Sequence, residues 1–213
     1  EEFPPFPPFV NYKICYKLQN LLIYKKFVNL QKILKNLGGF NLLMEKKLKK
    51  KVKEIVDERE EYVIRQIIAT FDLQAVNVEV SNGHVVHLSL KFKKIKKIIK
   101  EISAFFQLEE LDLSQNEIDK IEYLDNLHHL KVLHLQDNQI TKINGLENCV
   151  NLRYLDLSNN HIHEIEGLHS CRQLKTLILS RNHIKKIEGL SNLRNLEVLK
   201  LNNNPIEKIE NLK

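Results

Sequence analysis

The feature that most constrains this chain is a motif that recurs with a fixed spacing of 22 residues. Its five copies begin at Leu108, Leu130, Leu152, Leu174 and Leu196, and the fifth copy is incomplete. The copies share the pattern L-x-x-L-x-L-x-x-N-x-I-x-x-I-x-x-L-x-x-L, apart from Cys149 and Cys171 at the final leucine position. A period of this length indicates a solenoid, in which each repeat is one structural unit that stacks on the next.

The spacing of the apolar residues predicts the shape of one coil. In L-x-x-L-x-L the second and third leucines lie two residues apart, so both face the same side of a short strand. The later Ile and Leu positions recur every three residues, which suits a 3₁₀-like turn on the outer side of the coil. Stacked strands about 4.8 Å apart then form a parallel sheet along the concave side, and the apolar side chains form one continuous core.

Each repeat also has an asparagine where the chain leaves its strand. A buried side-chain amide at this point can hydrogen-bond to backbone groups of its own repeat and of the neighbouring turn. We therefore assign a purely structural role to this column of residues: Asn116, Asn138, Asn160, Asn182 and Asn204.

These residues resemble the leucine-rich repeat family. The 22-residue unit, with I-x-x-I-x-x-L on its outer side, is similar to the subclass found in the phosphatase-1 regulatory subunit that is built only of such repeats. The resemblance implies an α/β solenoid with a parallel concave sheet and a 3₁₀ or loop convex side. It also implies a non-enzymatic scaffold or regulatory subunit that recognises other proteins.

The residues before the repeats predict an N-terminal cap. Residues 85–107 look like a divergent first unit, in which Lys93 occupies the asparagine position. Residues 75–80 alternate like a strand, and Ser81-Asn82-Gly83 predicts a hairpin turn. From Glu45 to about Ala69 the apolar residues predict one face of a single helix: Leu48, Val52, Ile55, Val56, Val63 and Ile67. We expect a helix-hairpin cap over residues 44–84 and repeats over residues 85–213.

Residues 1–43 allow two interpretations. Met44 is the only methionine of the chain, and the segment before it is rich in residue types with A/T-rich codons. On the first interpretation, this segment is non-native, translated upstream sequence, and the true start is Met44. The other interpretation is an amphipathic helix over residues 18–37 that packs on the solenoid or lies on an anionic membrane.

The positive charge of the chain lies in its first half. Residues 1–43 carry a net charge of +4, residues 44–107 carry +5, and residues 108–213 carry −3. Attachment to nucleic acid or to an anionic membrane therefore depends on the first half, which includes the basic runs Lys46–Lys53 and Lys91–Lys100. Because both runs are interleaved with apolar residues, we favour a solvated helix face and a repeat edge over either kind of attachment.

Several features favour a cytoplasmic protein. The chain has three cysteines, no Asn-x-Ser/Thr site and no positive-then-apolar secretory leader. It also lacks a run of about 18 apolar residues, the length that a transmembrane helix needs.

The motifs give no support to catalysis or to a cofactor. Phosphate loops, dinucleotide-binding fingerprints, CxxC pairs and HExxH motifs are all absent from the sequence. Cys149 and Cys171 stack one repeat apart, within disulfide range, but we expect two inert thiols because free cysteine behaves as a small buried hydrophobe. His161, His163 and His183 suggest a metal site, yet no fourth ligand is evident and we expect exposed edge residues.

The concave surface is where we expect function, because its side chains are not needed for the core. The outward strand positions form two columns, in the order of the repeats: Glu110, Val132, Tyr154, Thr176 and Val198, and then Asp112, His134, Asp156, Ile178 and Lys200. The third outward position of the repeats is expected to hold Ser114, Gln136, Ser158, Ser180 and Asn202. An aromatic and aliphatic centre with a charged rim is typical of a protein-binding patch.

From this pattern we assign roles in binding. Tyr154, Val132 and Ile178 are the expected anchors. The residues that set orientation or complete the surface are Asp156, Asp112, His134, Lys200, Glu110, Val198 and Arg181. The alternative is that β-propensity alone placed Tyr, Val, Thr and Ile on these strands.

The expected partner is another protein, bound by a monomer without a small-molecule substrate, cofactor or metal. The sequence stops at Lys213 inside the fifth unit, which exposes an apolar edge, so we expect a fragment. The alternative function is therefore the recognition segment of a larger multidomain signalling protein, for example a GTPase-linked one.

Overall fold

The structure is a computed structural model that describes residues 40–71, 73 and 77–209. The chain divides into two compact units, Glu1–Met44 and Glu45–Lys213. The helix predicted over residues 18–37 lies outside the described residues, and both interpretations of residues 1–43 stay predictions.

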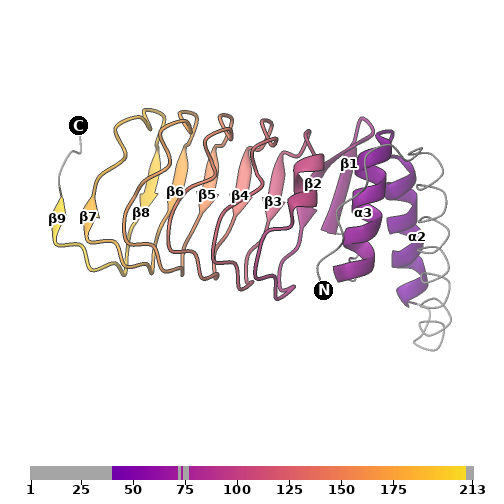
Figure 1. Ribbon diagram of the computed structural model, residues 1–213, viewed down its shortest axis with the longest axis horizontal. Coiled ribbons are helices and arrows are strands. Elements are labelled where there is room, and N and C mark those ends of the chain that lie inside the picture. Colours follow the sequence, from indigo (N-terminus) through magenta and orange to yellow (C-terminus); the bar gives the residue numbers. More distant parts are fainter. Residues whose placement is uncertain (1–39, 72, 74–76, 210–213) are drawn as a thin grey trace, which may run out of the picture. The chain divides into compact units, whose positions relative to one another are not determined.

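The second unit is built around one seven-stranded sheet (Figure 1). Its strand order is β1-β2-β3-β4-β5-β6-β8, where β1 and β2 are antiparallel and every later pair is parallel. The strands are short: β1 Val78–Ser81, β2 His84–Ser89, β3 Glu110–Asp112, β4 Val132–His134, β5 Tyr154–Asp156, β6 Thr176–Ile178 and β8 Val198–Lys200. The repeat therefore forms the predicted solenoid, in which each coil contributes one strand to this sheet.

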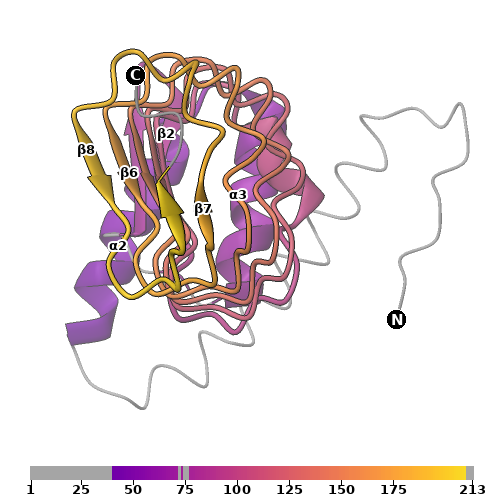
Figure 2. The ribbon, with the colours of Figure 1, turned by 90° about the vertical axis from the view of Figure 1, so that its left-hand side faces the viewer.

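The outer side of each coil returns the chain to the next strand. Viewed along the stack, the strands lie on one side of the coils, and β7 lies on the other (Figure 2). β7 (Lys186–Ile187) pairs in parallel with β9 (Lys208–Ile209). The predicted tight turns recur as backbone hydrogen bonds three residues apart, such as Leu127 N–H to the Leu124 carbonyl and Leu130 N–H to the Leu127 carbonyl. The 3₁₀ helix η2 (Lys100–Ala104) occupies this position in the first unit.

The side chains at the repeated positions fill the core, as predicted. The repeated Leu, Ile and Cys side chains of β3 to β6 and their outer turns are buried, most of them completely, except for the half-buried Leu190. Gly167 fits the same packing, because a Cβ at this position would collide with the carbonyl oxygen of Ile143 in the preceding coil.

The asparagine column joins neighbouring coils. Asn160 is 4% exposed, and its Oδ1 accepts a hydrogen bond from Ile140 N–H at 2.9 Å. Its Nδ2 donates to the carbonyls of Leu135, in the preceding coil, and Leu157, in its own. Asn138, Asn182 and Asn204 make equivalent contacts. The predicted structural role of this column is confirmed.

The cap has two helices, so the prediction of a single helix from Glu45 to Ala69 is wrong. α2 (Phe40–Lys53) ends before a short irregular segment, and α3 (Glu58–Phe71) begins after it. Asp57 causes the new start, because its carboxylate accepts hydrogen bonds from the N–H groups of Arg59 and Glu60, both at 2.9 Å. Val56, predicted to lie on the buried face, is 73% exposed because it lies in the irregular segment between the two helices, where its N–H donates to the Gly83 carbonyl.

A hairpin and a buried carboxylate connect α3 to the sheet. The predicted turn is present: Asn82 and Gly83 both have positive φ, 50° and 81°, between β1 and β2. The predicted strand over residues 75–80 is found as β1, and residues 75 and 76 lie outside the described residues. Glu60, on α3, is fully buried and accepts Val85 N–H at 2.8 Å, next to a 3.1 Å contact with His84 Nδ1.

Candidate functional site

The two predicted columns form on the concave face of the sheet. In the register of neighbouring strands, Glu110 pairs with Val132, Val132 with Tyr154, Tyr154 with Thr176 and Thr176 with Val198. The second column pairs in the same way through Asp112, His134, Asp156, Ile178 and Lys200. In each of β3 to β6 the middle leucine is buried and the two flanking side chains are half-buried, so the flanking residues form the accessible face.

The first unit extends both columns by one residue that the sequence analysis did not include. His87 pairs with Glu110 and Ser89 pairs with Asp112, because β2 lies parallel to β3. The Val85-x-x-Leu88 pattern carried this signal, since His87 is the residue before the second apolar position, as Glu110 is in the next unit.

Ser114 and Ser180 are not on the accessible face, so their prediction as outward residues is wrong. Ser114 is fully buried and Ser180 is 8% exposed. The strands end after three residues, and the side-chain alternation ends with them. Ser114 instead donates from Oγ to Asp112 Oδ1 at 2.6 Å, and Ser180 Oγ contacts Asn202 Oδ1 at 2.6 Å.

Arg181 lies apart from both columns. It is an exposed residue in the turn after β6, with φ of 57°, and its N–H donates to the Asn202 carbonyl. It occupies the same turn position as Asp137 and Asn159 in the preceding repeats. Its side chain therefore belongs to the edge of the concave face.

Two of the carboxylates are held in a fixed orientation. Asp112 Oδ1 accepts Ser114 N–H at 2.9 Å and Ser114 Oγ–H at 2.6 Å. Asp156 Oδ1 accepts the N–H and Oγ–H of Ser158 at the same two distances. In both residues the second oxygen has only a long contact, from Ser89 Oγ at 3.4 Å to Asp112 and from Tyr154 Oη at 3.5 Å to Asp156.

His134 lies between these two carboxylates in the second column. Its Nε2 is 3.8 Å from Glu110 Oε1, and its ring lies 5.0 Å from the ring of Tyr154. The other oxygen of Glu110 lies 3.3 Å from His87 Nδ1. The centre of the concave face is therefore a group of acidic, imidazole and aromatic side chains.

Tyr154 keeps its proton at neutral pH. Burial raises the pKa of its phenol above the usual value, and the negative charge of Asp156 raises it further. The ring therefore offers the face an aromatic surface with a hydroxyl that can donate.

The comparison with protein-family models gives one match. The model described as leucine-rich repeats (2 copies) matches residues 106–148, 128–170, 150–190 and 172–213, which together span half of the chain. The chain belongs to the leucine-rich repeat family. The comparison with curated proteins finds no match.

Solved leucine-rich repeat structures agree with the fold. Internalin C2 of Listeria monocytogenes is 32% identical, with a TM-score of 0.55, over 59% of this chain and 57% of that one. The ectodomain of the receptor kinase SOBIR1 of Arabidopsis thaliana is 21% identical, with a TM-score of 0.57, over 71% of this chain and 96% of that one. The present chain thus spans little more than half the length of internalin C2.

The two cysteines of the leucine-rich repeats are buried free thiols. Each Sγ lies near a leucine carbonyl of the preceding coil, at 3.9 Å for Cys149 and 3.7 Å for Cys171. Burial raises the pKa of Cys149 to about 12 and that of Cys171 to about 11. Both thiols stay protonated at neutral pH, where a protonated thiol is a poor nucleophile and a poor metal ligand.

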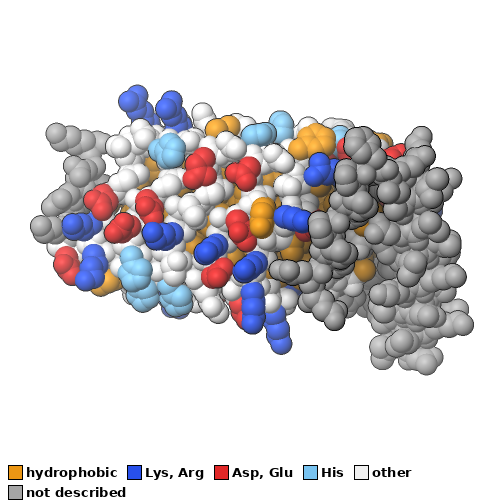
Figure 3. Space-filling view, viewed as in Figure 1, with side chains coloured by type: hydrophobic (Ala, Val, Ile, Leu, Met, Phe, Trp, Pro, Cys, Tyr) orange, Lys and Arg blue, Asp and Glu red, His pale blue; other side chains and the backbone are white. Residues whose placement is uncertain are grey.

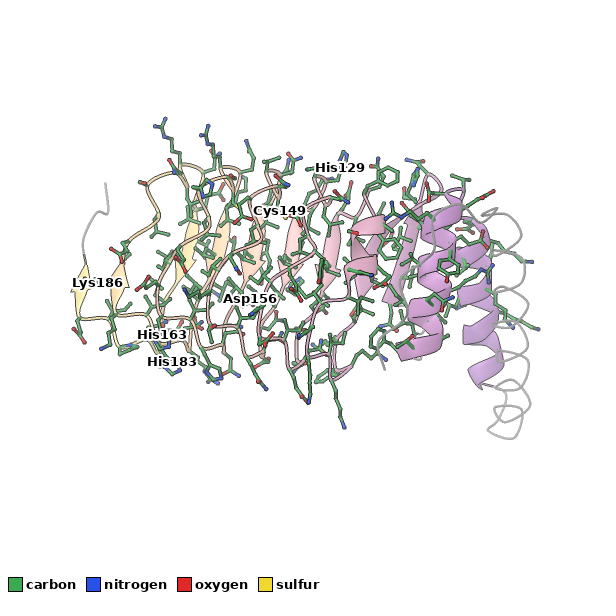
Figure 4. The ribbon with its side chains drawn as sticks, in the orientation of Figure 1. His129, Cys149, Asp156, His163, His183 and Lys186 are labelled. Atoms are coloured by element: carbon green, nitrogen blue, oxygen red, sulfur yellow. The ribbon has the colours of Figure 1, made fainter. Side chains whose placement is uncertain are left out.

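The three histidines stack along one edge of the leucine-rich repeats. The ring of His183 lies 5.6 Å from that of His161 and 5.3 Å from that of His163. His163 and His183 lie side by side at the edge opposite His129, and Asp156 lies nearer the middle of the coils (Figure 4). Among the residues that the structure describes, no group of three or more His, Cys, Asp or Glu side chains is placed to hold a metal ion.

One basic run, Lys46–Lys53, lies in α2 of the cap, and the other, Lys91–Lys100, lies in the first coil. Within Lys46–Lys53, Lys51 Nζ donates to the Val78 carbonyl at 2.6 Å, so part of this run supports the cap. On the face that Figure 3 shows, Lys and Arg side chains are interspersed with Asp and Glu. No helix within the described part of the chain has the length and apolar content needed to cross a membrane.

Proposed function

We propose that this protein is a non-enzymatic scaffold or regulatory subunit that binds another protein along its concave sheet. The observation that carries the proposal is the burial pattern within each strand. The middle leucine packs into the core, and the flanking side chains of Val132, Tyr154 and Ile178 are half-exposed on one continuous face.

The composition of this face supports a protein partner. Aromatic and aliphatic side chains next to charged ones are characteristic of protein interfaces, in which tyrosine often contributes much of the binding energy. Two pockets of the described residues, one lined by Ser103 and one lined by Asn151, contain none of the residues of this face. Leucine-rich repeat domains are generally protein-interaction modules, which supports the same conclusion.

A double variant tests the proposed surface. We expect Tyr154→Ala with Ile178→Ala to reduce partner binding at least tenfold, because it removes two anchors and leaves the core leucines unchanged. Binding is measured by capturing partners from a lysate of the source cells with immobilised protein and quantifying each by mass spectrometry.

The matched control is Tyr123→Ala with Val150→Ala. These residues are 43% and 45% exposed and lie outside the sheet, so the control removes the same kinds of side chain from another surface. Unfolding curves confirm that both variants fold. Equal capture by the double variant and the control contradicts the proposed surface.

The cellular setting is also part of the proposal. We expect a cytoplasmic monomer that acts as a regulatory or adaptor subunit, or as the recognition segment of a larger signalling protein. The two buried free thiols fit a reducing compartment. Sedimentation of the purified chain and imaging of the tagged protein in its own cells test the monomer and its location.

A further inference from the structure

The concave face carries its charges unevenly. Glu110, Asp112 and Asp156 all lie on β3 and β5, whereas the cation of the two columns, Lys200, lies two strands beyond Asp156 on β8. In the part of the chain that the structure describes, no lysine or arginine forms an ion pair with any of these three carboxylates. The middle of the face therefore has an excess of negative charge.

The geometry leaves the second oxygens of Asp112 and Asp156 available to a ligand. Their first oxygens are each saturated by two short hydrogen bonds from a serine. Within the described part of the chain, their second oxygens make contacts of 3.4 and 3.5 Å, at the long limit of hydrogen bonding. The serine contacts also reduce the entropy that each carboxylate loses when it binds a partner group.

Tyr154 adds a second feature that suits a cation. Its ring is half-buried beside Asp156 and faces the same side of the sheet. A guanidinium or ammonium group gains energy over an aromatic face as well as from nearby carboxylates. Val132 and Ile178 flank this position and can receive the aliphatic part of a long basic side chain.

His134 can compete with a cation of the partner for the same carboxylates. On β4 it pairs with Asp112 of β3 on one side and with Asp156 of β5 on the other, and neighbouring strands lie about 4.8 Å apart. The groups that face it are Glu110 and Asp112 from β3 and Tyr154 and Asp156 from β5, and Glu110 is shared with His87 of β2. When His134 is neutral, no lysine or arginine of the described residues is paired with these carboxylates. When it is protonated, it supplies a cation from within the face.

We infer that the concave face binds a protein segment that inserts a lysine or arginine side chain between Asp112 and Asp156, over Tyr154, and that protonation of His134 opposes this binding. The inference rests on the proposed function and specifies the partner chemistry. A positive charge on His134 repels the inserted cation, so binding weakens at lower pH.

The test uses a displayed library of random 12-residue peptides, selected on the full chain at pH 7.5. We expect the selected peptides to be enriched in lysine and arginine. The affinity of the best peptides is then measured by fluorescence anisotropy at pH 7.5 and pH 5.5. We expect it to fall about tenfold at the lower pH, the size of effect that one charge pair in an interface produces.

Three variants separate the contribution of the carboxylates from that of His134. Asp112→Asn with Asp156→Asn removes the carboxylates and is expected to weaken binding at pH 7.5 at least tenfold. His134→Lys places a permanent cation in the row and is expected to weaken binding at both pH values. The matched control, Asp119→Asn with Asp125→Asn, makes the same change in net charge at two exposed residues outside the strands and is expected to bind like the wild type.

The outcomes distinguish this inference from the proposed function. Peptides without basic enrichment whose binding is lost in Tyr154→Ala/Ile178→Ala overturn the inference and leave the proposed function intact. Binding that is insensitive to both pH and the two asparagine substitutions also overturns it. A library that yields no peptide dependent on the concave residues counts against both.

Discussion

The repeats and the N-terminal cap both bury polar groups, but they satisfy them with different chemistry. In the repeats, a neutral amide such as that of Asn160 bonds to the backbone of its own coil and of the preceding one. In the cap, the fully buried carboxyl of Glu60 holds Val85 N–H and contacts His84. The amide contacts recur every 22 residues, and the carboxyl contact occurs once.

This difference shows why the two regions respond differently to their environment. An amide does not titrate, so the asparagine column contributes equally at every pH. A carboxyl does titrate, and burial, the largest cause, raises the pKa of Glu60 above its ordinary value. The asparagine contacts that join the coils are therefore insensitive to pH, whereas the contribution of the buried carboxyl in the cap depends on pH.

The largest expected effect is from breaking the asparagine column. Asn160→Ala leaves the buried Ile140 N–H without its acceptor and removes one of the two amide donors of the Leu135 and Leu157 carbonyls. We expect a loss of about 3 kcal/mol in the free energy of unfolding. Urea unfolding followed by circular dichroism measures it.

The control for this substitution is Asn151→Ala. Asn151 is exposed and makes a single side-chain hydrogen bond, to the His128 carbonyl at 2.7 Å, so its removal is expected to cost less than about 1 kcal/mol. Similar losses for the two variants contradict the structural role of the buried column.

A smaller effect is expected in the cap. Glu60→Ala leaves Val85 N–H without its acceptor, and we expect a loss of about 2 kcal/mol at pH 7. Glu60→Gln keeps one acceptor oxygen and is expected to cost less than half as much. The same urea unfolding curves, recorded for the wild type and both variants, measure these losses. Equal losses for the alanine and glutamine variants contradict an acceptor role for Glu60.

The pH dependence of the cap sharpens the comparison. Because the pKa of Glu60 is raised in the folded state, the folded protein binds a proton more readily than the unfolded chain. The wild type therefore gains stability relative to Glu60→Gln as the pH falls from 7 towards 4, and loses that gain as the pH rises through the folded pKa. Unfolding curves at four pH values measure the difference. The penalty of Asn160→Ala should stay constant over the same range, and a parallel change contradicts the distinction.

The smallest expected effect is the chemical modification of the thiols inside the repeats. Because burial raises the pKa of Cys149 and Cys171 to about 12 and about 11, we expect no modification by an alkylating reagent at pH 8 in the folded protein. Mass spectrometry of a Cys15→Ser variant, before and after unfolding in urea, measures it. Rapid modification of both thiols without urea indicates coils that open.

The sequence predicted the repeats well because their contacts recur. The 22-residue spacing that aligned Glu110 with Val132, and Asp112 with His134, in the sequence is the register that the sheet adopts. The two serines were misplaced because the pattern does not show where a strand ends. Ser114 lies two residues after Asp112, which matches the alternation, but the chain has already turned.

The cap was predicted less well because its contacts are unique. The pairing of Glu60 with Val85 joins residues 25 apart with no repeat to reveal it. The break between α2 and α3 did have a signal, since Asp57 followed by Glu60 is typical of a helix start. Asp57 caps the helix, whereas Glu60 turns to the hairpin instead. The contact of His87 with Glu110 did have a signal in the Val85-x-x-Leu88 pattern, but the two columns were counted only from the first regular repeat at Leu108.

The central claim is that the repeated residues hold the coils together and leave the concave side chains available for a partner. The most direct test is the free energy of unfolding of Val132→Thr/Tyr154→Thr/Ile178→Thr, which keeps β-favouring residues on the strands and removes the three anchors. The account predicts a loss below about 1 kcal/mol, together with loss of partner binding. A loss as large as that of Asn160→Ala means that these side chains stabilise the fold, and contradicts the account.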